Sequence, residues 1–150
     1  IYISKYIFGF FVEDPSNEDD KFKRVKIRSF LKNLETEGLD KKKFLLTINN
    51  LKFSNETIKF YTKKNLLQNT YFSEKKKLII LKESFFHHSA EVIFRSFTDV
   101  IEIVGKKYYP VRGKKIDSII QLINNKSYFK VTLGGCKIKK INQTVIVSKE

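Results

Sequence analysis

Apolar residues recur at intervals of three and four in four stretches of the chain, the spacing that places them on one face of an α-helix. This pattern predicts helices over residues 19–37, from Asp40 to about Asn69, over 89–104, and from Pro110 to about Asn124. We expect the inward-facing side chains to be Phe22, Val25, Ile27, Phe30, Leu31 and Leu34 in the first helix, Phe44, Leu45, Ile48, Leu51 and Ile58 in the second, Ile93, Phe97, Val100, Ile101 and Val104 in the third, and Ile116, Ile119, Ile120 and Ile123 in the fourth.

Residues at the borders of these stretches support the helix assignments. Gly38 and Gly105 follow the first and third stretches and predict their ends, because glycine adopts the left-handed backbone that often terminates a helix. Asp40 can cap the second helix through its carboxylate, and Pro110 suits the first turn of the fourth. The acidic residues 18–20 are expected in the first turn of the first helix, where the helix dipole favours negative charge.

The pattern changes to β-type alternation near the end of the chain. The runs "YFKVTL", "CKIKKI" and "TVIVSK" predict three strands, separated by the two-residue turns Gly134-Gly135 and Asn142-Gln143. Earlier, "YFSEKKKLIILKE" predicts two short strands or an extended segment, with Lys75–Lys77 at the bend. The predicted fold is therefore mainly α with a small C-terminal antiparallel β meander: an α+β arrangement of four main helices followed by three short strands, beginning at about residue 128.

Length and charge narrow the functional classes. A chain of 150 residues with 41% hydrophobic residues suits one domain, or one small domain and a piece of another, and can build a packed core. Its net charge of +14 is typical of proteins with a polyanionic partner, although an AT-rich genome would also enrich the 26 Lys over the 4 Arg. Residues 1–102 hold 19 basic and 14 acidic side chains, whereas residues 103–150 hold 11 and 2, and this asymmetry favours a basic surface on the C-terminal third.

The sequence contains no complete set of catalytic residues. Cys136 is the only cysteine, which excludes a disulfide framework or a cysteine-rich zinc site, and we interpret it as a small buried residue or a hairpin residue rather than a nucleophile. His87-His88 has no metal-binding partner at suitable spacing and is interpreted as a solvated pair at a helix entrance. No apolar run is long enough to span a membrane, so a cytoplasmic protein is expected. Because the chain has no Met and begins at Ile1, we expect it to be the tail of a longer polypeptide.

Two of the four arginines stand out near the start of the first predicted helix. Arg24 and Arg28 are four residues apart and therefore share a helix face, where two guanidinium groups can bind phosphates in a bidentate manner. The structural alternative is that they pair with Asp14, Asp20 or Glu35 and stabilise the helix entrance.

The stretch "VEDPSNEDDKFKRVKIR" resembles the motif that closes the ATP-binding domain of the tRNA(Ile)-lysidine synthetase family, in which Asp-Pro-Ser-Asn precedes acidic or polar residues and an Arg-x-x-x-Arg helix. The segment "AEVIFRSFTDVIEIVGKKYYPVRGKKIDSIIQLI" is similar to the central helical segment of that family, and "TLGGCKIKKINQTVIVSKE" is similar to its hairpin region. One departure is Val25, where many members carry Asn. The other is that the Ser-Gly-Gly-x-Asp-Ser nucleotide loop of the family is absent from these 150 residues.

The resemblance implies an enzyme that uses ATP, with Mg expected, to attach lysine to the wobble cytidine of an isoleucine tRNA. It implies that residues 1–38 are the tail of the catalytic domain and that residues 39–150 bind tRNA. No catalytic residue and no cofactor is assigned to this chain alone. The implied sites are nucleotide or tRNA-phosphate contacts at Arg24 and Arg28, a positioning turn at Asp14, Pro15, Ser16 and Asn17, and a tRNA-binding basic surface of Arg95, Lys106, Lys107, Arg112, Lys114, Lys115, Lys137, Lys139 and Lys140.

Two other functions remain open at this point. The chain could be a non-enzymatic remnant that keeps its affinity for tRNA or other RNA, or an unrelated helical interaction domain whose basicity is compositional. The sequence assigns no oligomeric state. If tRNA affinity falls steeply as the salt concentration rises, the chain contacts phosphates, and the unrelated interaction domain is excluded.

Overall fold

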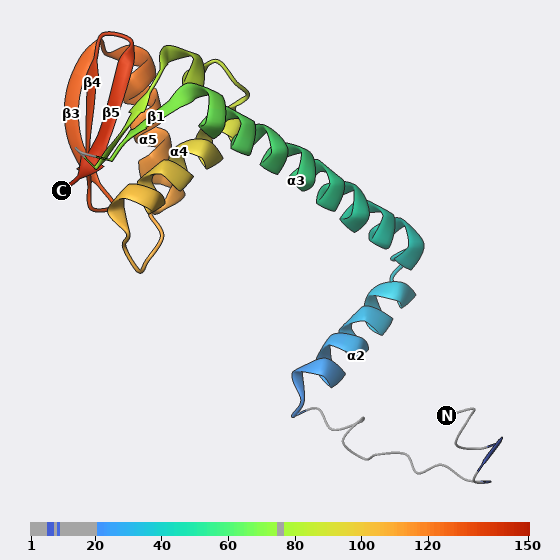
Figure 1. The fold of residues 1–150 in the computed structure, drawn as a ribbon. Helices are drawn as coiled ribbons and strands as arrows, with labels where there is room; N and C mark the ends of the chain where they lie inside the picture. The colour runs from blue at the N-terminus through green and yellow to red at the C-terminus, as the bar shows by residue number, and fades with distance from the viewer. Residues whose placement is uncertain (1–5, 8, 10–20, 75–76) are drawn as a thin grey trace. The chain divides into compact units, whose positions relative to one another are not determined.

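The computed structural model describes residues 6–7, 9, 21–74 and 77–150, and the chain divides into an N-terminal unit, residues 1–51, and a C-terminal unit, residues 52–150. The predicted turn Asp14–Asn17, the acidic residues 18–20, and Lys75 and Lys76 lie outside the described residues. The elements are α2 (Lys23–Thr36), α3 (Lys41–Asn69), β1 (Thr70–Ser73), β2 (Leu78–Leu81), the 3-10 helix η2 (Glu83–Phe86), α4 (Ala90–Gly105), α5 (Gly113–Asn125), β3 (Tyr128–Leu133), β4 (Cys136–Ile141) and β5 (Thr144–Lys149) (Figure 1).

The predicted fold class is confirmed, with more strands than expected. The three C-terminal strands have the predicted bounds and pair antiparallel with each other. β1 and β2 form a hairpin that joins them, because β2 pairs with β5 through Ile79–Val147 and Leu81–Val145. The result is one five-stranded antiparallel sheet in the order β1-β2-β5-β4-β3. The prediction of three strands was wrong because the pairing of β2 with β5 joins segments far apart in the sequence.

The core of the C-terminal unit lies between one face of this sheet and two helices. α4 and α5 supply the predicted isoleucines, valines and Phe97, and the sheet supplies the inward positions of β2 to β5. Fifteen buried residues form this cluster: Ile79, Leu81, Phe85, Phe97, Val100, Ile101, Val104, Ile116, Ile119, Ile123, Phe129, Cys136, Ile138, Val145 and Val147.

The N-terminal unit has few buried side chains. Of the residues predicted to face inward there, Val25 is buried. Phe22, which precedes α2, and Ile27, Phe30 and Leu31 of α2 are exposed. Phe44, Leu45, Ile48 and Leu51 of α3 are exposed as well. The predicted helices are therefore present, and the predicted burial was wrong for these eight residues, because no described element of the N-terminal unit covers them.

Helix ends follow the predicted chemistry only in part. Asp40 caps α3, since its Oδ1 accepts hydrogen bonds from the backbone N–H groups of Lys42 and Lys43 at 2.9 and 3.2 Å. α2 begins at Lys23 rather than at Asp19, and its first turn holds no acidic residue. α5 begins at Gly113, after Pro110.

Gly105 is the last residue of α4, and the left-handed position after it belongs to Lys106, with φ of 48°. The reason is tertiary: a Cβ on Gly105 would lie 2.0 Å from the carbonyl oxygen of Gly134. Gly134 and Gly135 have φ of 61° and 78° and form the predicted turn between β3 and β4. The turn therefore packs directly against the end of α4.

Candidate nucleic-acid interface

Within the C-terminal unit, α4 and α5 cover one face of the five-stranded sheet, and no described element of this unit covers the other face, here called the open face. Strand pairing places Lys130, Lys139, Ile146, Ile80 and Tyr71 in one row across this open face. A second row runs through Thr132, Lys137, Ser148, Leu78 and Ser73, and a third through Tyr128, Ile141 and Thr144. Along the strands, which lie wholly within the described residues, no outward position carries Asp or Glu.

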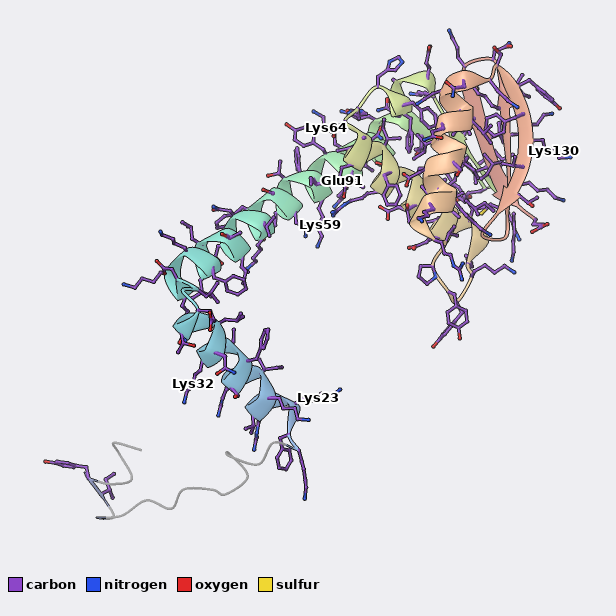
Figure 2. The ribbon with its side chains drawn as sticks, turned by 180° about the vertical axis from the view of Figure 1, so that it is seen from behind. Lys23, Lys32, Lys59, Lys64, Glu91 and Lys130 are labelled. Carbon is purple, nitrogen blue, oxygen red and sulfur yellow. The ribbon has the colours of Figure 1, made fainter. Side chains whose placement is uncertain are left out.

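Three lysines and two tyrosines give the open face its chemical character. Tyr71 and Tyr128 are 63% and 64% exposed. The ammonium of Lys139 lies 5.9 Å from the centroid of the Tyr128 ring, which keeps cation and ring side by side. Figure 2 shows Lys130 on the outer side of the sheet, away from α5. Exposed rings can stack on nucleobases, and lysines on the same face can neutralise phosphates.

The sequence analysis identified two of these five side chains. Lys137 and Lys139 were predicted, and the structure brings them together on the open face. Tyr71, Tyr128 and Lys130 were missed. The strand alternation contained the signal for Lys130 and Tyr128, because both lie at outward positions of β3 in register with Lys139 and Ile141.

The structure separates the remaining predicted basic residues from the open face. Lys140 points to the opposite side of β4, where its ammonium donates to the carbonyl oxygen of Ile123 in α5. Lys106 and Lys107 follow α4, and the side chain of Lys107 packs over Gly135. Arg112, Lys114 and Lys115 are exposed at the start of α5.

Arg95 has partners that hold it between two helices. Its Nε donates to Glu91 Oε1 at 2.7 Å, and its Nη1 donates to Asn55 Oδ1 of α3 at 2.6 Å. Its side chain is 34% exposed, so the residue links α4 to α3 while part of the guanidinium reaches solvent.

Arg24 and Arg28 are both exposed and lie one turn apart on α2, as predicted. The guanidinium of Arg24 lies 5.3 Å from the centroid of the Phe22 ring. Glu35, one of the partners considered for this pair, forms an ion pair with Lys41 at 3.6 Å. Asp14 and Asp20, the other two, lie outside the described residues.

Cys136 is buried and the two histidines are exposed to solvent, as the sequence predicted. Cys136 is buried, its Sγ lies 3.4 Å from the carbonyl oxygen of Ile101, and burial, with a smaller effect of Glu150, raises the pKa of the thiol to about 11. A thiol of this kind is a poor nucleophile at neutral pH. His87 and His88 are exposed, and the described residues contain no cluster of His, Cys, Asp and Glu that could hold a metal ion.

Two known proteins match almost the whole chain. The tRNA(Ile)-lysidine synthase of Wolbachia pipientis wMel is 25% identical over 140 residues, which are 93% of this chain and 32% of that protein. The chain resembles the tRNA(Ile)-lysidine synthetase family. The enzyme of the same name from Wolbachia sp. subsp. Brugia malayi (strain TRS) is 24% identical over 140 residues, which are again 93% of this chain and 32% of that protein. These matches confirm the resemblance to this family that the motifs indicated.

The match covers only part of each of these two proteins. The chain spans about a third of the length of these curated relatives, which fits the C-terminal portion predicted for it. No family model matches the chain. No helix among the described residues is long and apolar enough to cross a membrane.

Proposed function

We propose that this chain is the tRNA-binding C-terminal portion of a tRNA(Ile)-lysidine synthase. The observation that carries the proposal is the similarity to two such enzymes over 93% of the chain. The reaction of the whole enzyme attaches lysine to the wobble cytidine of an isoleucine tRNA at the expense of ATP, with Mg expected. ATP and lysine are assigned to a catalytic domain that carries the nucleotide loop, and the role of this chain is to hold the tRNA.

The open face of the sheet supports a tRNA-binding role. Lys130, Lys137 and Lys139 give it positive charge without acidic neighbours on the strands, and Tyr71 and Tyr128 provide exposed rings. Lysines that contact phosphates displace condensed counterions, so binding should weaken steeply as salt rises. In an unrelated interaction domain whose basicity is merely compositional, the affinity for tRNA would not depend on where the lysines lie.

The first experiment measures the affinity of the chain for an unmodified isoleucine tRNA transcript by fluorescence anisotropy across a KCl series. We expect the double variant Lys137→Glu/Lys139→Glu to lose at least about tenfold in affinity and to show a shallower salt dependence. The matched control Lys42→Glu/Lys43→Glu makes the same change of charge on exposed residues of α3 and should change affinity much less. Equal losses in the two variants would mean that net charge alone drives binding, and the proposal would be wrong.

Arg24 and Arg28 are proposed to contact phosphates of the nucleotide or of the tRNA. Their spacing and exposure on α2 support this role. Arg28→Lys keeps the charge but loses the bidentate geometry, so we expect tRNA affinity to fall about tenfold while the melting temperature stays unchanged. If the variant melts early and binds normally, the arginine has a structural role instead.

A further inference from the structure

A groove between α3 and α4 concentrates positive charge around an apolar floor. Four residues of α3 line it, Lys59, Thr62, Lys63 and Leu66, and four of α4, Phe94, Arg95, Thr98 and Asp99. Its volume is about 390 Å³, within the range of small-molecule sites. All eight residues belong to the C-terminal unit. Because α4 covers the inner face of the sheet, the groove is separate from the open face described above.

The α3 wall has the spacing of one helix face. Lys59, Thr62, Lys63 and Leu66 are at positions i, i+3, i+4 and i+7, so the two ammonium groups lie one turn apart along the groove. Lys64, the next residue along α3, does not line it, and in Figure 2 Lys59 and Lys64 leave the helix on different sides. The groove is therefore lined by only some of the lysines of α3.

The α4 wall adds a guanidinium, a ring and a carboxylate. Arg95 is already held by Glu91 and Asn55, which fixes its position and leaves further N–H groups for a ligand. The Phe94 ring lies between the groove and the start of α5, since a Cβ on Gly113 would be 3.4 Å from its Cζ. Leu66 faces the groove from the other helix, so a flat apolar group can enter between the two.

The wall also contains two further polar residues, Thr62 and Asp99. The hydroxyl of Thr62 is buried and makes no hydrogen bond within the part of the chain that the structure describes. The carboxylate of Asp99 can accept hydrogen bonds from an N–H donor, and its charged neighbours are Glu102 and Arg95. A ligand that matches the cations, the ring and the carboxylate carries an anion at the lysines, a flat ring at Phe94 and an amino group at Asp99.

We propose that the groove binds a nucleoside phosphate whose base carries an exocyclic amino group. The phosphate binds Lys59, Lys63 and Arg95, the base packs against Phe94 and Leu66, and the amino group donates to Asp99. The same chemistry is offered by a free nucleotide and by one unpaired nucleotide of an RNA strand. The proposal does not rest on the function proposed above, since it concerns a different surface.

The test uses the intact chain and measures binding of CMP, UMP and inorganic phosphate by NMR titration, followed on the amides of Phe94 and Thr98. We expect CMP to shift these amides at lower concentration than UMP or phosphate. Lys63→Glu should weaken CMP binding about tenfold, because a charge-assisted contact is replaced by repulsion. The matched control Lys64→Glu makes the same change of charge on the neighbouring residue and should change binding less than about twofold.

The outcomes separate the groove from general electrostatics and from the tRNA surface. Equal weakening by Lys63→Glu and Lys64→Glu, or no shift at Phe94 and Thr98 with any probe, would overturn the proposal. Asp99→Asn should abolish the preference for CMP over UMP, and an unchanged preference contradicts the assigned base contact. A cytidine hexamer that binds tighter than CMP identifies an RNA strand as the source, whereas equal affinity identifies a free nucleotide. The variant Lys137→Glu/Lys139→Glu should leave CMP binding unchanged even if it abolishes tRNA binding.

Discussion

The N-terminal unit, residues 1–51, and the C-terminal unit, residues 52–150, carry similar stripes of apolar residues but bury them to very different extents. In α4, Phe97, Val100 and Ile101 are almost fully buried, because the sheet lies against them. In α2, Ile27 and Phe30 remain 60% and 62% exposed. The comparison teaches that periodicity determines where apolar side chains line up on a helix, whereas burial requires a second surface.

The sharpest test of this contrast removes a phenylalanine from each unit. Phe97→Ala should cost about 4 kcal/mol in the free energy of unfolding, because a fully buried ring is lost and a cavity is left behind. Phe30→Ala should cost less than about 0.5 kcal/mol, because its ring is mainly in solvent. Urea unfolding of both variants measures the difference. A large loss in Phe30→Ala would show that the N-terminal unit buries its apolar stripe in solution.

A second test concerns the contact between the end of α4 and the turn between β3 and β4. Gly105→Ala should destabilise the C-terminal unit by about 3 kcal/mol, since the new methyl group would overlap the carbonyl oxygen of Gly134. Gly113→Ala, also in a helix, places its methyl group in ordinary contact with Phe94 at 3.4 Å and should be nearly neutral. Thermal melting of the two variants is the measurement, and similar melting temperatures would contradict the close packing.

The third test addresses the buried amide that joins α3 to the C-terminal core. Asn65 donates through Nδ2 to the carbonyl oxygen of Phe85 at 3.1 Å and to Ser96 Oγ at 3.2 Å, and its Oδ1 accepts from Asn69 at 2.8 Å. Asn65→Ala leaves buried partners unpaired and should cost about 2 kcal/mol. Asn49→Ala changes an exposed residue of the same helix and should cost little. Hydrogen exchange of the α3 amides would show whether the end of the helix loosens in the first variant alone.

The smallest effect is expected from Cys136. Its pKa is raised to about 11 from an ordinary value of 9.0, so the thiol is neutral in the folded chain and should react with a disulfide reagent at pH 8 far more slowly than in urea. Its contribution to stability is complete below pH 9 and is lost as the pH rises through about 11, because the unfolded thiol ionises first. Cys136→Ala should lack this component of the pH dependence of unfolding. Rapid labelling of the folded chain at pH 8 would contradict the burial.

Local chemistry explains why much of the fold could be predicted. The strands β3 to β5 have their predicted bounds, because alternation and two short turns fix a hairpin without distant information. The buried faces of α4 and α5 were also predicted, apart from Val92, Ser96 and Gly105, because the stripes there are long and regular. The Asp40 cap is a contact within three residues and needs no tertiary structure.

The candidate sites depended on distant pairings that no local pattern contains. Lys139 and Tyr71 share a row only because β2 pairs with β5. The contact of Lys140 with Ile123 likewise requires α5 to pack on the covered face of β4. Arg95 looked like a surface cation, but contact between α4 and α3 pairs it with Asn55. The same contact makes Lys63 a groove residue and leaves Lys64 outside it.

The sequence by itself determined the helices, the C-terminal hairpins, the basic character of the last third and the resemblance to tRNA(Ile)-lysidine synthetases. These properties depend on periodicity, turn residues, charge and short motifs, all of which act over a few neighbouring residues. Only the tertiary structure decided that the sheet has five strands, that one face stays open, that Gly105 must lack a side chain, and that α2 exposes its apolar stripe. Each of these outcomes depends on which surface lies opposite a residue, and that is set by the packing of the whole chain.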